Sequence, residues 1–399
     1  MKGVILVENS FVHPYMPNSV SENKKAMLDE LGINSVEDIY KSIIPDELLY
    51  KERLDIPEPI RSEYELKRHV MGILNRDITT EEYTSFLGAG CYKHQVPAIC
   101  DEINSRGEFL TAYCGDTYSD HGKMQAIFEY TSMMGELLDT DVVSYTTYDG
   151  GQAVASSLRM AVRAVREKGM AGKVILVPKT MNPEIYSQVV QYCRNVAEVR
   201  KIAYEPETGL MDLEELKEQL AKKNVAAVFF ENPTYLGNFE TRGEEIAKLA
   251  HDAGAYCVVQ TEVAALGIME SPVNQGADIV CGDIQPLGMH IQFGGGQAGF
   301  IACNQNMDLV EQFPTYMYGI TETEKEDTYG WGRAMNYRSS HGSRENAKEY
   351  FGTETGLWAI TAGVYLASMG PQGMYELGET IIQNAAYLED ILDEIPKVR

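Results

Sequence analysis

The sequence has 399 residues, of which 44% are hydrophobic, and its acidic side chains outnumber the basic ones by 59 to 34. This length allows one large domain with one or two smaller ones. The formal net charge of −25 argues against a nucleic-acid partner, because binding to phosphates needs basic patches. We interpret the acidity mainly as a source of solubility, with the steering of a cationic ligand as the alternative.

The sequence also bears on where the protein works. No apolar run approaches the length of a membrane span, and the first residues contain too few consecutive apolar side chains for a signal peptide. The seven cysteines form no CxxC pair, which argues against a zinc site. An odd number of cysteines in a long chain predicts reduced, mostly buried thiols. We therefore predict a cytoplasmic protein without membrane contact or a metal.

Residues 1–80 are predicted to form an N-terminal helical arm. Short segments with helical apolar spacing alternate with breaks, and Gly32 and Pro45 end the first two of them. Packing on the surface of the main domain and contact within an oligomer are both open as the role of this arm.

Residues 81–352 are predicted to form a large α/β domain with functional loops. From residue 150 onward, buried strands and helices alternate about five times. Continuous apolar strands joined by helices indicate a mostly parallel, doubly wound sheet covered on both faces. Residues 305–352 lack clear elements and are interpreted as functional loops. Residues 353–399 are predicted to be closing helices that begin a small C-terminal domain.

Two polar loops carry candidate site residues. The loop "FLGAGCYKHQVP" (86–97) presents Tyr92 and His94, and its glycines allow a ligand to approach the backbone closely. His94 is interpreted either as a catalytic group or as a structural hydrogen-bond donor. The loop "FLTAYCGDTYSDHG" (109–122) adds Tyr113.

A helix start is a third candidate. In "YDGGQA", Asp149 is suited to cap the helix, and Gly150 and Gly151 leave the first amides uncovered. Such an end binds anions readily. The alternative interpretation is a tight helix start with nothing bound.

The stretch "YRSSHGSREN" is a fourth candidate. Its Arg338, His341 and Arg344 follow one another at a spacing of three residues. On a helical turn they would share one face and could grip a carboxylate or a phosphate. A solvated basic face is the alternative.

Several stretches together are specific for one family. They are "FLGAG-Y-H--P", "AIFEY", "YDG--A", "GADIV-G--QPLG----FGG---GF" and "R--H--RE". In order and spacing, from about Pro14 to the end of the chain, they resemble subunit 1 of glycine dehydrogenase (decarboxylating), the α-type half of the P-protein of the glycine cleavage system.

The resemblance implies a fold type I pyridoxal-phosphate architecture and a division of labour. In this family a β-type chain holds the cofactor through a lysine Schiff base, and the α-type paralogue completes the active site of an α2β2 heterotetramer. The complex decarboxylates glycine and passes the aminomethyl group to a lipoyl group on a carrier protein. The resemblance thus implies a β-type subunit, a lipoyl carrier and a small amino-acid substrate as partners.

Aligned with the β-type paralogue, the turn "GDIQPLG" has Gln285 where the anchoring lysine would stand. Gln260 and Thr261 stand where an aspartate would face the pyridine nitrogen, and Glu262 is expected to point to the other face if the strand continues. An amide forms no imine, so this chain alone is predicted to hold no Schiff base. The positions equivalent to the cofactor pocket, predicted to be vacant, are Asp149, Gly150, Gly151 and Gln285.

The leading hypothesis is therefore an α-type subunit. The side chains expected to line or brace the shared cleft are Tyr92, His94, Tyr113, Arg338 and His341. The loops at 109–122 and 337–353 depart from the family pattern, which leaves open a regulatory or scaffold paralogue, or a related system acting on a different amino acid or amine. A third hypothesis is a stand-alone pyridoxal enzyme that uses another lysine, such as Lys179.

Overall fold

The protein divides into two compact units, Met1–Thr79 and Thr80–Arg399. The computed structural model describes residues 12–50, 52, 54–88, 90–109, 122–339, 342–349 and 355–396.

The first unit is helical, as the sequence predicted. Its helices are α1 (Ser21–Leu31), α2 (Glu37–Lys41) and α3 (Glu63–Leu74). Helix α1 ends at Gly32 in the left-handed conformation, with φ of 69°, which a residue without Cβ adopts at little cost. None of the described residues of this unit is buried.

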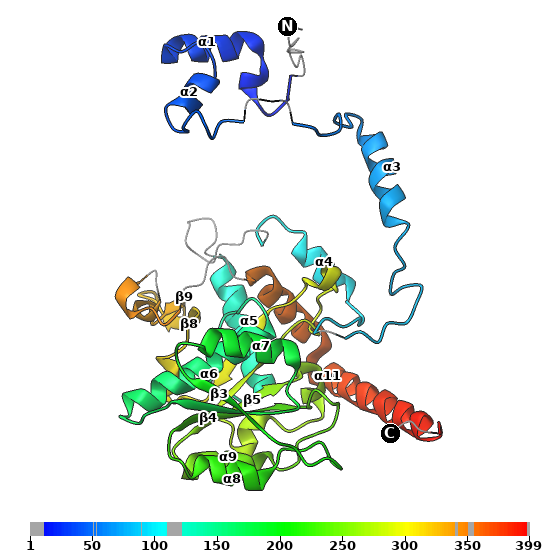
Figure 1. Cartoon of the computed structure of the whole chain (residues 1–399), viewed down its shortest axis with the longest axis vertical. Helices are drawn as coiled ribbons and strands as arrows, with labels where there is room; N and C mark the ends of the chain where they lie inside the picture. The colour runs from blue at the N-terminus through cyan, green and yellow to red at the C-terminus, as the bar shows by residue number, and fades with distance from the viewer. Residues whose placement is uncertain are drawn as a thin grey trace. The chain divides into compact units, whose positions relative to one another are not determined.

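A seven-stranded sheet forms the centre of the second unit (Figure 1), with the strand order β1-β7-β6-β5-β4-β2-β3. Strands β3, β2, β4, β5 and β6 run parallel to one another, whereas β7 is antiparallel to both its neighbours, β6 and β1. The strands are β1 (Val142–Val143), β2 (Val174–Pro178), β3 (Glu198–Ile202), β4 (Val225–Asn232), β5 (Tyr256–Thr261), β6 (Ile279–Asp283) and β7 (Gly299–Cys303).

Helices cover both faces of this sheet. In Figure 1, α6 and α7 lie on one side of the strands, and α8 and α9 on the other. The helices of this unit are α4 (Ala98–Asn104), α5 (Gly122–Leu138), α6 (Gly150–Glu167), α7 (Pro183–Cys193), α8 (Leu213–Leu220), α9 (Gly243–Asp252), α10 (Met307–Val310) and α11 (Gly356–Asp393).

Strand β4 shows how the sheet separates two hydrophobic cores. All its residues are buried, and successive side chains point to opposite faces. Val228 and Phe230 join the core that includes α5, α8, α9 and α11, whereas Ala227 and Phe229 join the core of α6 and α7. A strand apolar on both faces is what a doubly wound sheet requires, so the predicted α/β class is confirmed.

The region interpreted as loops contains more structure than the sequence suggested. Strands β8 (Met317–Glu322) and β9 (Tyr329–Ala334) form an antiparallel hairpin. The prediction of a region without elements at 305–352 is therefore wrong. The two predicted closing helices form the two parts of α11, which bends where Gly370 (φ 62°) precedes Pro371.

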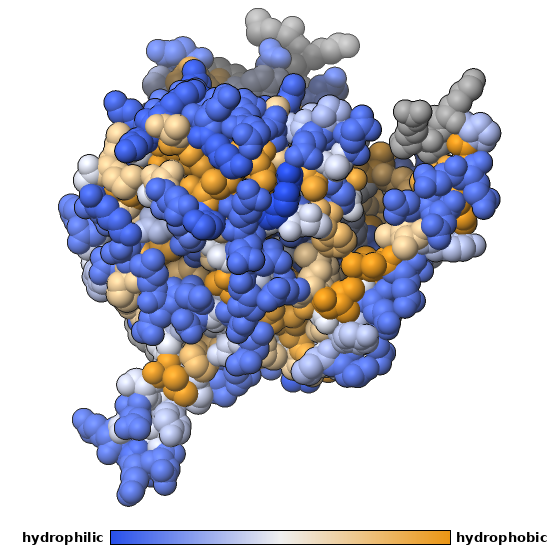
Figure 2. Space-filling model, turned by 90° about the horizontal axis from the view of Figure 1, so that it is seen from below, coloured by the Kyte–Doolittle hydropathy of each residue, from blue (hydrophilic) through white to orange (hydrophobic). Residues whose placement is uncertain are grey.

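Hydrophilic residues cover much of the face shown in Figure 2, with hydrophobic residues in smaller groups among them. None of the helices in the described residues is long and apolar enough to cross a membrane. The same residues contain no group of three or more His, Cys, Asp or Glu side chains arranged to hold a metal ion.

Candidate functional site

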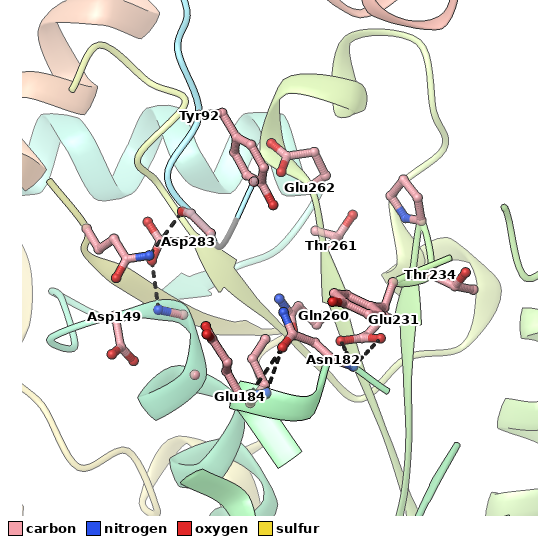
Figure 3. A pocket seen from close by; sticks show the side chains of 18 of the residues that line it. Tyr92, Asp149, Asn182, Glu184, Glu231, Thr234, Gln260, Thr261, Glu262 and Asp283 are labelled. Atoms are coloured by element: carbon pink, nitrogen blue, oxygen red, sulfur yellow. Dashed lines mark hydrogen bonds between the residues drawn. The ribbon is translucent and has the colours of Figure 1, made fainter. Parts of the chain in front are cut away.

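A pocket of about 810 Å³ opens at the carboxyl ends of the parallel strands (Figure 3). It lies where ligands bind in open α/β sheets. The ends of β4, β5 and β6, the starts of α6 and α7 and the loop around Tyr92 line it. It encloses enough volume for a ligand of cofactor size.

The start of α6 forms one wall of the pocket. Asp149 caps this helix, because its Oδ1 accepts a hydrogen bond of 2.6 Å from the backbone amide of Gln152. The Gly150 amide donates to Oδ2 of Asp283 at 2.8 Å. The predicted cap is confirmed, and the amides of Gly150 and Gln152 have partners within the chain.

Asp283, the last residue of β6, accepts hydrogen bonds from further backbone amides. Its Oδ1 accepts from Gln285 at 2.8 Å and from Ala298 at 3.3 Å. Burial raises the pKa of Asp283 to about 7, while the backbone donors act in the opposite direction. This carboxylate therefore sits in a cradle of amides and is solvated by the backbone in place of water.

Two other acidic side chains in the pocket share this perturbation. Burial raises the pKa of Glu231 and that of Glu262 to about 7. The carboxyl group of Glu231 lies near Asn182, whose backbone amide donates to its two oxygens at 3.2 and 3.3 Å. Tyr92 lies beside Glu262 (Figure 3), and burial followed by this charge raises the pKa of its phenol.

The condition attached to the orientation of Glu262, that the strand continues, is not met. Strand β5 ends at Thr261, so the alternation of faces stops there. Glu262 instead caps the short helix Val263–Gly267 by accepting from the Ala264 amide at 3.1 Å. Its side chain therefore lines the same pocket as Gln260 and Thr261.

Gln285 does not point into the pocket. Its side chain is fully buried, and its Oε1 accepts from the Tyr92 amide at 3.1 Å. Its Nε2 donates to the carbonyls of Tyr92 and Met289, each at 3.0 Å. The amide that stands at the expected lysine position is therefore a clamp between the strand-to-loop turn and the loop of Tyr92.

His94 supports the same junction. Its Nε2 lies 3.1 Å from the Gln285 carbonyl and 2.9 Å from the Met289 carbonyl, so Nε2 carries the proton. Burial lowers the pKa of His94, which favours a neutral ring. Since His94 is not among the residues that line the pocket, its contacts fit the structural interpretation.

The arginines of the fourth candidate stretch do not share a helical face. Arg338 is buried and donates to the backbone carbonyls of Phe313 and Thr315. It belongs to the turn Asn336–Arg338, whereas Arg344 is exposed in the separate turn Arg344–Asn346. The predicted paired grip on an anion is wrong for these two residues. His341 and Tyr113 lie outside the described residues.

The structure thus brings only part of the predicted site together. Among the candidates, the described residues that line the pocket are Tyr92, Asp149, Gly150 and Gly151. Sequence reasoning missed Glu231 and Asn182. Glu231 lies at the end of β4, and Asn182 lies in the loop after β2. The rule that ligands bind at the carboxyl ends of parallel strands could therefore have identified them. Lys179 is exposed and does not line the pocket.

The pocket does not fit covalent pyridoxal phosphate. The described lining residues include no lysine, arginine or histidine. The anion cradle at α6 already receives Asp283, and Gln260 and Thr261 offer no carboxylate to a pyridine nitrogen. No chemical step of this chain is therefore assigned to that cofactor.

Comparisons with known proteins agree with this geometry. The family model described as "Glycine cleavage system P-protein" matches residues 13–398. A relative from Pyrococcus horikoshii, "Probable glycine dehydrogenase (decarboxylating) subunit 1", is 36% identical over 386 residues, which cover 96% of this chain and 83% of the relative.

Solved structures show the same relationship. A crystal structure of glycine decarboxylase (P-protein) of the glycine cleavage system, in inhibitor-bound form, superposes with a TM-score of 0.83 at 31% identity, covering 97% of this chain and 83% of that one. A sphingosine-1-phosphate lyase from Burkholderia pseudomallei is similar in fold alone, with a TM-score of 0.58 at 14% identity and coverage of 87% and 77%. With sequence and structure in agreement over nearly its whole length, the chain belongs to the glycine cleavage system P-protein family.

Proposed function

We propose that this chain is the α-type subunit of a glycine decarboxylase, and that it completes the active site of a β-type partner in a cytoplasmic α2β2 assembly. The observation that carries this proposal is Gln285 at the expected anchor position, buried as a structural clamp within a chain of this family. The partner would supply the lysine and pyridoxal phosphate, which serves as the electron sink when bound.

In this assembly the chain's own residues are proposed to bind and orient the substrate and to exclude water from the cleft. Tyr92 and Tyr113 are proposed to line the shared cleft, and His341 to donate to the substrate carboxylate or to relay a proton. His94 and Arg338 are proposed to brace it, because each holds backbone carbonyls. The aminomethyl group leaves on the lipoyl group of a carrier protein.

Reconstitution with the β-type chain tests the proposal. The two chains together, with pyridoxal phosphate, are expected to exchange bicarbonate with the carboxyl group of glycine, whereas neither chain alone does so. Borohydride reduction should fix the cofactor only on the β-type chain. A reduced adduct on this chain alone would contradict the proposal, and a loaded mixture without exchange would favour a regulatory subunit or a different amino acid.

Substitutions then test the site residues. Tyr113→Phe and His341→Ala are expected to lower the exchange rate by about 10²-fold or more without dissociating the complex in gel filtration. Tyr337→Phe, which removes an exposed hydroxyl outside the pocket, serves as the matched control. Full activity of both site variants would show that these two residues take no part.

A further inference from the structure

The first turn of α6 has the geometry of a phosphate site, but two of its amides already donate to side chains of this chain. The Gly150 amide donates to Asp283 at 2.8 Å and the Gln152 amide donates to Asp149 at 2.6 Å. Between them, Gln188 covers Gly151, where a Cβ would lie only 2.6 Å from Nε2 of Gln188. Side chains of this chain therefore occupy two of the first amides of the helix and pack against the residue between them.

Asp283 occupies the position of an anionic ligand in this arrangement. Amides from three separate parts of the chain, those of Gly150, Gln285 and Ala298, donate to its two oxygens. Converging backbone donors at a helix start are the usual way in which proteins hold a phosphate oxygen. The donors that a phosphate would need are here satisfied by a carboxylate.

The glycine at the helix start is explained by the same contact. A Cβ on residue 150 would lie 3.0 Å from the Cβ of Asp283 and 3.2 Å from its amide nitrogen. Gly150 thus lets the carboxylate-bearing strand β6 approach α6. The absence of a Cβ at residue 150 thus makes room for a side chain of the protein itself.

The charge of the pocket also disfavours the binding of a phosphate. No cationic side chain is found among its lining residues in the described part of the chain. A second anion beside Asp283 would be repelled by the acidic side chains of the pocket without a cationic lining residue to offset that repulsion. The acidic residues that line it are Asp149, Glu184, Glu231, Glu262 and Asp283.

We propose that Asp283 is an internal substitute for a bound phosphate, and that it, more than the missing lysine, keeps phosphate-bearing ligands out of this pocket. Asp283 is on this account the specificity-determining residue of the pocket. The inference concerns this chain by itself and does not depend on catalysis by a partner.

Binding to the purified full chain tests the proposal, with pyridoxine 5′-phosphate as the probe and pyridoxine as the matched ligand. Neither compound has an aldehyde, so surface lysines do not react with them. Measured by calorimetry at about pH 8, above the raised pKa of Asp283, the wild-type chain is expected to show no preference for the phosphate ester. Asp283→Asn is expected to tighten the dissociation constant for the ester by about tenfold or more, with pyridoxine unchanged.

Matched variants separate the cradle from the general charge of the pocket. Glu231→Gln removes a pocket carboxyl of similarly raised pKa away from α6, and it is expected to change binding of the ester by less than about threefold. Gln285→Lys alone should bind the ester no better than wild type. Asp283→Asn removes the charge but leaves a side chain in the cradle, whereas Asp283→Ser also shortens the side chain and opens the cradle; thermal unfolding is recorded for each variant.

Three results would overturn the proposal. The first is a wild-type chain that already binds the phosphate ester more tightly than pyridoxine. A gain in Glu231→Gln equal to that in Asp283→Asn would show that net charge alone decides. Folded Asp283→Asn and Asp283→Ser proteins that bind no more ester than wild type would show that Asp283 does not block the site.

Discussion

Glu231, Glu262 and Asp283 lie in one pocket and are buried there without a cationic partner among the lining residues that the structure describes. Burial disfavours the charged form of a carboxyl, and backbone amides offset this cost only in part. At the scale of single residues, the titration of these three side chains should therefore make the free energy of unfolding depend on pH.

We expect the free energy of unfolding to fall as the pH rises from about 4 to about 7 and then to level off. The unfolded carboxyls titrate near pH 4, whereas these three hold their protons in the folded state up to about pH 7. The folded protein thus binds more protons in this window, and stability decreases with pH there. Urea unfolding at a series of pH values measures the effect.

Repulsion within a chain of net charge −25 changes stability in the same direction, so a variant is needed as control. Glu231→Gln removes one titrating group and is expected to reduce the slope by about 1 kcal/mol per pH unit at most. An unchanged slope in this variant would show that Glu231 titrates normally.

Gln285 carries a second prediction at this scale. Gln285→Leu is expected to lower the free energy of unfolding by about 2–4 kcal/mol, because the backbone amide and carbonyl of Tyr92 lose their Gln285 partners and the Met289 carbonyl keeps only the contact with His94. Chemical denaturation measures the loss. Gln372→Leu, at an exposed helical position whose amide contacts only Glu376, should stay within about 0.5 kcal/mol, and an equal loss there would contradict the argument.

The sequence predicted which residues stand at this site better than where their side chains point. Asp149 and the glycines after it follow from local rules of helix capping, and the structure places them in the pocket. The buried clamp of Gln285 joins residues that are 193 positions apart. No local pattern encodes such a contact, so the sequence could place Gln285, His94 and Arg338 at or beside a cleft but could not show which backbone groups they hold.

At the scale of elements, β6, β7 and the start of α6 approach one another more closely than side chains permit. A Cβ at Gly299 would lie 2.1 Å from Oγ1 of Thr147 and 2.2 Å from the carbonyl of Asp149. The backbone of Gly299 exchanges hydrogen bonds of 2.9 and 3.1 Å with Thr147. Strand β7 thus fixes the segment that leads into α6, and with it one wall of the pocket.

Gly299→Ala is therefore expected to destabilise the protein by about 3 kcal/mol through overpacking, as measured by chemical denaturation. The matched control is Gly332→Ala in β9, where an added Cβ meets no atom within 4 Å. Gly332→Ala should leave stability unchanged or slightly raised. Equal effects of the two substitutions would show that the close approach at Gly299 relaxes at no cost.

The elements themselves were largely predictable. Apolar runs separated by helical segments predict a parallel sheet, and the observed strand order agrees. The hairpin of β8 and β9 was missed because glycine, tyrosine and threonine dominate it and its side chains are mostly half-buried or exposed. Such strands lack the alternation of apolar and polar residues on which sequence reasoning depends.

At the scale of the whole molecule, the division into two units matters most. The described residues between 12 and 79 bury no side chain, whereas the second unit contains both hydrophobic cores. Burial of apolar surface supplies most of the stability of a folded domain. The second unit therefore accounts for the cooperative unfolding of the protein.

A chain that begins at Thr80 is accordingly expected to unfold within about 3 °C of the full chain in calorimetry. The same truncation distinguishes the two roles considered for the arm. A loss of affinity for the β-type chain at an unchanged melting temperature would indicate an oligomer contact. A large drop in melting temperature would instead show that the arm packs on the main unit and would contradict the expectation.

If Gln285 stands at the position of an anchoring lysine, as proposed, its clamp makes a return to lysine costly. Lysine donates hydrogen bonds but accepts none, so its return would leave the Tyr92 amide without the acceptor that Oε1 provides. It would also place a charge at a fully buried position, at a high cost in solvation. Any single step back to a cofactor-bearing chain thus lowers stability before it restores chemistry. In the proposed assembly, packing as well as reactivity would then keep the cofactor on the partner chain.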